Sequence, residues 1–170
     1  LRVYQSRMQV PLVMTVIGKD RTGLVESIAR IVADHGGNWL ESRMCRLGGE
    51  FAGILRVLVP AVKRAALEQA LQKMEGLSIV VRVDDVPDTR DEARFAALEL
   101  IGPDRPGIVR EITHALAAQG VNVEELATKC ASAPMSGEPL FQAQAKLLLP
   151  AAVTVPALRQ AVEKAVTGMT

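Results

Sequence analysis

The chain has 170 residues, of which 49% are hydrophobic and 23% charged, and its formal net charge is +1 at neutral pH. Acids and bases are interspersed and only 3% of the residues are aromatic, so we expect neither a basic stripe for phosphates nor a stacking platform for bases. No apolar run reaches the length of a membrane-spanning helix. Composition therefore argues against direct nucleic-acid binding and against a membrane protein.

The cysteines and histidines give no sign of a metal or catalytic centre. Cys45 and Cys130 are the only cysteines, and without a CxxC pair they are typical of reduced thiols in a cytoplasmic protein. Both fall on predicted strands, where we expect inert, half-buried core thiols. His35 and His114 have no metal-ligand spacing. We therefore predict no metal site and no catalytic residue.

The first half of the chain alternates between strand and helix periodicity. The expected elements are, in order, a strand at 12–17, a helix at 24–32, strands at 38–47 and 51–59, a helix at 67–74 and a strand at 79–83. Glycine pairs end the first helix and form a tight turn between the second and third strands. The predicted order is βαββαβ.

The same pattern then returns in the second half. Ten of the 24 residues from Gly18 to Glu41 are identical to those from Gly102 to Glu125. The third strand aligns at a larger offset, which places six extra residues in an exposed hairpin loop around 131–139. An internal repeat of this length predicts two domains rather than one.

We place the first domain at residues 8–85, a linker at 86–92 and the second domain at 93–170. Each is predicted to be an α+β, ferredoxin-like βαββαβ domain, an antiparallel sheet with helices on one face. At the larger offset, the fourth strand of the second domain would begin near Gly168, close to the end of the sequence given. We expect residues beyond that end, residues 1–5 or another chain to fill this edge.

A short glycine-bounded loop joins the first strand to the first helix in both halves. It reads Gly-Lys-Asp-Arg-Thr-Gly at 18–23 and Gly-Pro-Asp-Arg-Pro-Gly at 102–107. We expect its first glycine to let the backbone turn closely. We expect its last glycine to lie just inside the helix, with Pro106 at the first helical position, leaving first-turn N–H groups open to an anion. Neither the P-loop nor the dinucleotide-binding pattern is present.

Each loop carries an aspartate at its apex, and each second strand begins with an asparagine. Asp20 and Asp104 are placed to receive an ammonium group, or simply to stabilise a helix N-terminus. Asn38 and Asn122 are candidate ligand contacts, or only turn residues that tolerate unusual backbone angles. The arginine after each aspartate is expected to be solvated or paired with an acid.

These residues resemble the tandem ACT-domain proteins. The motif Asp-Arg-Pro-Gly-Ile-Val at 104–109, its first-copy counterpart at 20–25 and the Gly-x-Asn that follows each carry the resemblance, which covers most of both copies. A free-standing pair of this size resembles the glycine cleavage system transcriptional repressors within that family. The segment Gly-Gly-Asn-Trp-Leu-Glu-Ser-Arg-Met at 36–44, followed by Phe-Ala-Gly at 51–53, strengthens this closer match.

The resemblance implies a non-enzymatic regulator that binds glycine or another small amino acid, and no other cofactor. ACT domains commonly bind such ligands where two copies meet side by side, with the loop of one copy facing the start of the second strand of the other. The ligand-binding positions carried over are Gly18, Asp20, Gly23, Asn38, Gly102, Asp104, Gly107 and Asn122. Many ligand-binding ACT domains have asparagine where this chain has the two aspartates.

The resemblance also implies a protein partner, a LysR-type transcriptional activator or another regulated protein, contacted without DNA. Because helices cover only one face of each predicted sheet and leave its edge strands exposed, we also expect a homodimer. The copies differ at Thr22 against Pro106 and at Trp39 against Val123, so we expect one copy to bind ligand and the other to contact the partner. A regulatory subunit or assembly module of a biosynthetic enzyme is the main alternative. An acylphosphatase-like enzyme is disfavoured, because the aspartate beside each loop arginine would repel phosphate.

Overall fold

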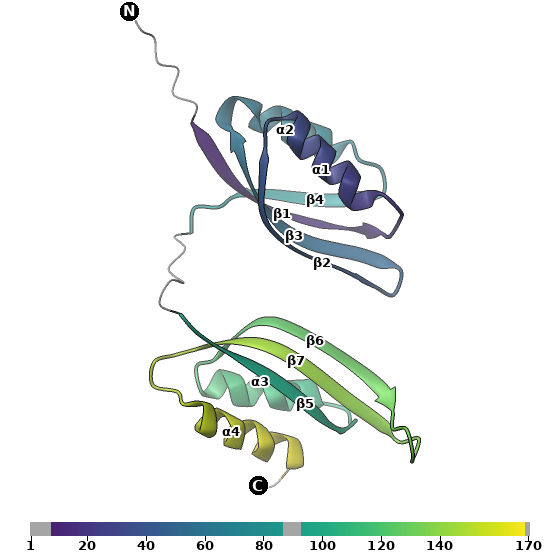
Figure 1. The fold of residues 1–170 in the computed structure, drawn as a ribbon, viewed down its shortest axis with the longest axis vertical. Helices are drawn as coiled ribbons and strands as arrows, with labels where there is room; N and C mark the ends of the chain where they lie inside the picture. The colour runs from purple at the N-terminus through teal and green to yellow at the C-terminus, as the bar shows by residue number, and fades with distance from the viewer. Residues whose placement is uncertain (1–7, 87–92, 169–170) are drawn as a thin grey trace, which may run out of the picture. The chain divides into compact units, whose positions relative to one another are not determined.

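The computed structural model describes residues 8–86 and 93–168, and the chain divides into two compact units, Leu1–Pro87 and Asp88–Thr170. We call them unit 1 and unit 2. Each is an antiparallel sheet with two helices packed on one face (Figure 1). The predicted α+β, ferredoxin-like architecture is confirmed.

Unit 1 has the complete βαββαβ order. Its elements are β1 (Gln9–Lys19), α1 (Leu24–Asp34), β2 (Asn38–Leu47), β3 (Glu50–Pro60), a 3₁₀ turn (Ala61–Lys63), α2 (Arg64–Gln72) and β4 (Leu77–Val83). The sheet order is β2-β3-β1-β4, and Leu12 lies opposite both Val57 and Val83. The loop that follows β1 therefore leaves from a central strand.

Unit 2 repeats the arrangement up to its second helix. Its elements are β5 (Arg94–Pro103), α3 (Ile108–Ala118), β6 (Asn122–Ser132), β7 (Pro139–Leu149) and α4 (Val155–Thr167), with sheet order β5-β7-β6. The extra residues form the loop between β6 and β7, as predicted. Within 93–168 no strand occupies the free side of β5, where β4 lies in unit 1; residues 1–5, one expected filler, fall outside the described residues.

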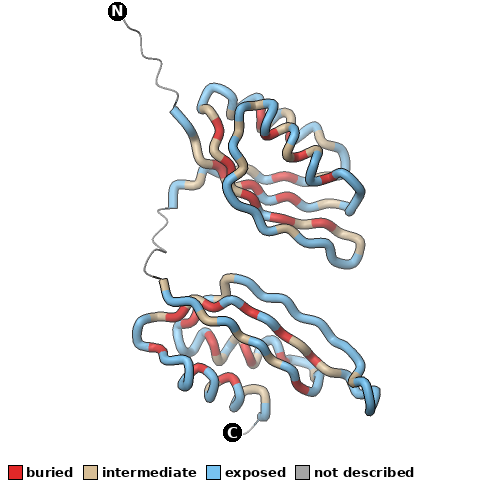
Figure 2. The backbone as a smooth tube through the Cα atoms, in the orientation of Figure 1, coloured by how far each residue is buried: buried red, intermediate tan, exposed pale blue. Residues whose placement is uncertain are grey.

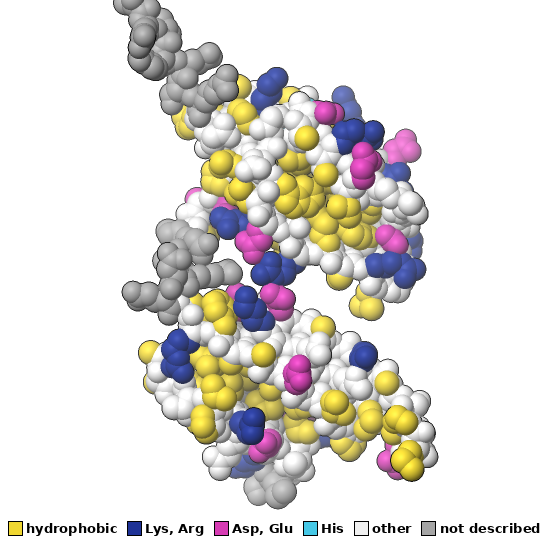
Figure 3. All heavy atoms as spheres, viewed as in Figure 1, with side chains coloured by type: hydrophobic (Ala, Val, Ile, Leu, Met, Phe, Trp, Pro, Cys, Tyr) yellow, Lys and Arg dark blue, Asp and Glu magenta, His cyan; other side chains and the backbone are white. Residues whose placement is uncertain are grey.

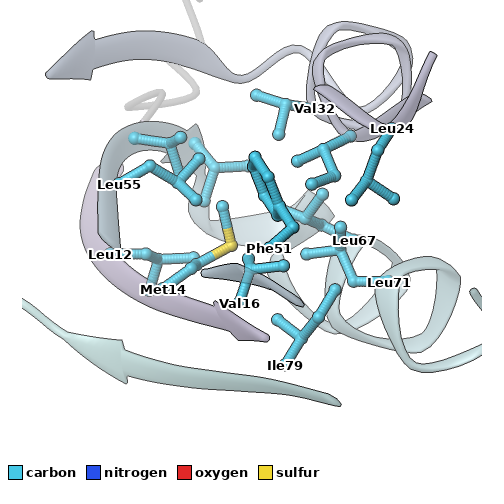
Figure 4. Close-up of a cluster of buried hydrophobic side chains, with 13 residues drawn as sticks. Leu12, Met14, Val16, Leu24, Val32, Phe51, Leu55, Leu67, Leu71 and Ile79 are labelled. Carbon is cyan, nitrogen blue, oxygen red and sulfur yellow. The ribbon is translucent and has the colours of Figure 1, made fainter. Parts of the chain in front are cut away.

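The cores lie between each sheet and its helices. Figure 2 shows buried positions alternating along the strands and recurring on one side of each helix, as the periodicity predicted. In Figure 4, Leu12, Met14 and Val16 from β1 project into the same cluster as the apolar side chains of α1 and α2. These three β1 side chains are fully buried, whereas their β5 counterparts are only partly buried, because β5 has a neighbour on one side only.

The expectation that both cysteines are core thiols is wrong. Cys45 and Cys130 are exposed, because they lie on β2 and β6, the edge strands of the two sheets. Each of these strands has a single neighbouring strand. The periodicity identified the strands but not their place at the edge of the sheet.

Charged side chains of both signs are scattered over the face seen in Figure 3, which agrees with the absence of a basic stripe in the sequence. Among residues 8–86 and 93–168 no helix is long and apolar enough to cross a membrane.

Candidate functional site

The first glycine of each loop differs in how closely its surroundings would crowd a side chain. A Cβ on Gly18 would lie 2.2 Å from the carbonyl oxygen of Gly76, so close approach to the start of β4 requires glycine there. A Cβ on Gly102 would meet only Cγ1 of Val166, at 3.6 Å, which is ordinary contact. In unit 1, glycine is therefore needed for strand packing, whatever the loop binds.

The last glycines of the loops are helix caps. Gly23 and Gly107 have φ of 82° and 87° and precede α1 and α3 as N-cap residues, so the expectation that they lie just inside the helix is wrong. Pro106 consequently lies before the cap rather than at the first helical position. Neither cap supplies a side-chain hydrogen bond, which leaves first-turn N–H groups without a side-chain acceptor.

The apex of the unit 1 loop is held to the neighbouring hairpin and its charge is paired. The Asp20 N–H donates to the carbonyl oxygen of Gly49 at 3.0 Å. The Asp20 carboxylate forms an ion pair with Arg46 of β2, with Nε and Oδ2 2.8 Å apart. An incoming ammonium group would have to displace this guanidinium.

The apex of the unit 2 loop has the same backbone anchor but no cation. The Asp104 N–H donates to the carbonyl oxygen of Pro139 at 3.0 Å, and within the described ranges its carboxylate forms no ion pair. Its neighbour is the Cys130 thiol. Partial desolvation, and next the Asp104 charge and hydrogen bond, raise the pKa of the Cys130 thiol.

The loop arginines also differ between the units. Arg105 makes two hydrogen bonds to the carboxylate of Glu111, and it donates to the carbonyl oxygens of Ala165 and Val166 at the end of α4, each at 3.1 Å. Arg21 is exposed and makes no such bond to the residues of the described ranges. The unit 2 loop is therefore tied to both helices of its unit, and that of unit 1 is not.

The structure does not bring the asparagines to the loops within either unit. Asn38 and Asn122 are exposed at the start of β2 and β6, and the Asn122 amide donates to Oε1 of Glu124 at 2.6 Å. In unit 1 the 11 residues of α1, about 16 Å of helix, separate Asn38 from the loop. A site that combines loop and asparagine remains a prediction about two different copies.

Sequence reasoning missed a shallow apolar hollow between α3 and β6 in unit 2, with a volume of about 10 Å³, room for a single water molecule. Its lining includes Val109, Thr113, Val123, Leu126, Thr128 and Ala143. It also missed Arg46 and Cys130 beside the aspartates. Aligning β2 with β6 would have shown how the residues at these positions differ between the two copies.

In the part of the chain that the structure describes, no three His, Cys, Asp or Glu side chains gather as a metal site would require.

Two βαββα units, each with a capped loop between its first strand and first helix, define a tandem ferredoxin-like protein. Residues 10–83 match the ACT domain family model. The UPF0237 protein MJ1558 of Methanocaldococcus jannaschii is 31% identical over 80 residues, which cover 44% of this chain and 89% of that protein. The chain belongs to the ACT-domain family.

Two solved structures are similar over nearly the whole chain. A protein of unknown function from Galdieria sulphuraria is 30% identical, with a TM-score of 0.80, over 95% of this chain and 94% of that one. A candidate glycine cleavage system transcriptional repressor is 18% identical, with a TM-score of 0.66, over 95% and 93%. At that identity the second likeness concerns the fold alone.

Proposed function

We propose that this chain is a non-enzymatic regulatory protein that responds to a small amino acid. The observation that carries the proposal is the unit 2 loop. There the Asp104 carboxylate has no cationic partner among the described residues, and α3 begins four residues later without a side-chain cap. Membership of the ACT-domain family supports the same role.

The loop combines a group that attracts cations with groups that attract anions. A carboxylate at the apex attracts an ammonium group, and the N-terminus of α3, whose first-turn N–H groups have no side-chain acceptor, attracts a carboxylate. An α-amino acid carries both charges, whereas a phosphate would be repelled by Asp104. The chemistry of the loop therefore favours a zwitterion.

The ligand would act by binding one arrangement of the protein better than another, because equal affinity for both shifts nothing. We propose that the arrangement controls contact with a protein partner, a LysR-type activator of glycine cleavage genes, without direct contact with DNA. The target comes from the sequence resemblance to the glycine cleavage system transcriptional repressors, and a candidate repressor of this kind shares the fold. We further propose a cytoplasmic homodimer.

Isothermal titration calorimetry of the full chain with a panel of amino acids tests the sensing role. We expect at least one of them to bind, with the affinity reduced by Asp104→Asn, which keeps the shape of the side chain and removes its charge. Absence of binding by the whole panel at millimolar concentration would remove the sensing part of the proposal.

A regulatory subunit or assembly module of an amino-acid biosynthetic enzyme is a second candidate. It is favoured by exposed apolar side chains on the helix-free face of the unit 1 sheet, where Ile17, Ile54 and Val80 are each about half exposed. Affinity capture with the tagged chain separates the two. A transcription factor in the captured fraction supports the first candidate, and a biosynthetic enzyme supports the second.

A further inference from the structure

The face of the unit 1 sheet that α1 and α2 leave uncovered carries a contiguous, mainly apolar patch (Figure 1). Thr15 lies between Ile54 on β3 and Val80 on β4. Two residues along β1, and therefore on the same face, Ile17 lies opposite Ala52. The side chains of Ile17, Ile54 and Val80 are each about half exposed. We call these five residues the unit 1 patch.

The same face of unit 2 is polar at the matching positions. Where unit 1 has Thr15, Ala52 and Ile54, unit 2 has Glu99, Gln142 and Gln144. Both sheets have the same strand pairing, so this fold does not need apolar side chains on its uncovered face. A patch that is kept in one copy only is typical of an interaction surface.

Charged side chains border one end of the unit 1 patch. The Arg56 guanidinium donates from Nε to Oδ2 of Asp84 at 2.7 Å, and its Nη1 lies 3.6 Å from Oε2 of Glu41. Glu41, Arg56, Val13 and Arg82 form one row across the four strands, with Glu41 on the outer strand β2 and Arg82 on the outer strand β4. An apolar centre with an ion-paired rim is the usual anatomy of a protein interface.

The two ends of this row have opposite charges, which suits a second copy of the same face. A twofold axis that runs along the strands between β3 and β1 keeps the strand direction and reverses the strand order. It places β2 over the β4 strand of the other copy and β3 over its β1, in two sheets about 10 Å apart. Glu41 then faces the partner's Arg82. Within the described ranges, Arg82 is exposed and forms no ion pair in its own copy.

The same rotation also matches side chains by size. Ile54 on β3 faces the partner's Thr15 on β1, and Ile17 on β1 faces the partner's Ala52 on β3. Each large side chain thus meets a small one, as interdigitation of two packed sheets requires. A twofold axis generates every such contact twice.

We propose that the unit 1 patch is the interface of a homodimer in which the two unit 1 sheets pack face to face. This interface rests on the homodimer proposed above and states which surface forms it. Four strands and the seven residues of β4 span about 19 by 24 Å, or roughly 450 Å² of planar area on each copy. That is a small interface, so we expect a reversible dimer that dissociates in the micromolar range.

Analytical ultracentrifugation of the full chain over a concentration series tests the surface. Ile17→Gln should raise the dissociation constant of the dimer at least about tenfold, because the axis places each substitution in the interface twice. The matched control is Ile101→Gln at the corresponding, exposed position of unit 2, which should leave the constant within about twofold. Fluorescence of Trp39 verifies that unit 1 is folded in each variant, and Ile54→Gln provides a second substitution in the patch.

Cross-linking tests the orientation of the two sheets. Cys45 and Ser78 stand at opposite ends of the row that contains Ala52 and Ile17, so Cys45 faces the partner's Ser78. The two copies of Cys45 are offset sideways by three strand spacings, about 14 Å. With Ser78→Cys and Cys130→Ser, a short bifunctional thiol reagent should therefore give a covalent dimer. Adding Cys45→Ser should abolish the cross-link, and Cys130→Ser alone should not give one.

The outcomes separate the interface from the homodimer itself. A chain that stays monomeric at every concentration removes both, while amino-acid binding is decided by calorimetry. A dimer that Ile17→Gln and Ile101→Gln weaken equally, or that cross-links without Cys45, overturns the interface and leaves the homodimer standing. If Ile17→Gln leaves the dimer intact and abolishes capture of a biosynthetic enzyme, the patch binds that enzyme and the proposal is wrong.

Discussion

Replacing Gly18 by alanine tests whether this loop glycine serves packing. The added Cβ would lie 2.2 Å from the Gly76 carbonyl oxygen and 2.7 Å from Cδ2 of Leu77. The first neighbour is backbone, which cannot turn away as a flexible side chain does. Gly18 does not have a left-handed φ, so alanine costs no backbone strain there and the effect is steric.

The magnitude follows from overpacking. Forcing extra atoms into a packed interior costs about 1–3 kcal/mol, and the entropy that alanine removes from the unfolded chain returns less than about 1 kcal/mol. We expect a net loss of about 2 kcal/mol in the free energy of unfolding of unit 1. For a unit of this size, such a loss lowers the melting temperature by about 8–16 °C.

Trp39 makes the assay specific to unit 1. It is the only tryptophan in the chain and packs, partly buried, against the unit 1 core, so its fluorescence follows the unfolding of that unit in urea or on heating. Gly102→Ala is the matched control. There the Cβ makes ordinary contact at 3.6 Å and φ is not left-handed, so we expect no loss of stability, or a gain of up to about 1 kcal/mol.

Two results would refute this reasoning. One is a Gly18→Ala variant whose fluorescence transition stays within about 0.5 kcal/mol of wild type. The other is a Gly102→Ala variant whose circular dichroism transition shows as large a loss, because the two loops would then need glycine for a shared reason such as the turn itself.

Three further predictions concern unit 2. Asp104→Asn should lower the apparent pKa of Cys130, because a negative neighbour that disfavours the thiolate is removed; the pH profile of alkylation, measured with the other cysteine replaced by serine, checks this, and an unchanged profile would contradict the contact. Gly107→Ala should cost about 1–2 kcal/mol by urea unfolding, through its left-handed φ alone, since a Cβ there meets nothing within 4 Å; an unaffected midpoint would be inconsistent with the cap geometry. Arg105→Ala should cost about 1 kcal/mol and speed amide hydrogen exchange at the end of α4, which a merely solvated arginine would not do.

Most of the secondary structure could be predicted because its signals are local. The spacing of Leu24, Ile28 and Val32 indicates one buried helix face, and all three are buried. Glycine pairs marked the end of α1 and the turn between β2 and β3. Since the second copy repeats these signals, its elements followed from the first.

What sequence reasoning missed depends on which strands are neighbours. The exposure of Cys45 follows from the position of β2 at a sheet edge, and alternation of apolar residues does not give that position. The ion pair between Asp20 and Arg46 requires the pairing register of β2 with β3. The order of the elements already implied that a helix separates the loop from Asn38. Because α1 is rigid, the loop and Asn38 of one unit cannot contact the same small ligand.

Comparison of the two copies gives the most information where their differences compensate. The change from Met44 and Gly53 to Thr128 and Ala143 exchanges a long and an absent side chain for two short ones, and Leu55 opposite Ser42 becomes Ala145 opposite Leu126. Such paired exchanges keep a groove packed while changing where it is open. The loss of Arg46 at the matching position in unit 2 has no counterpart of this kind, since a cysteine supplies no positive charge to the adjacent aspartate. Because a surface ion pair adds only about 0–1 kcal/mol to stability, the fold of unit 2 does not require one at Asp104, and the difference between the copies concerns the charge that each loop presents to solvent.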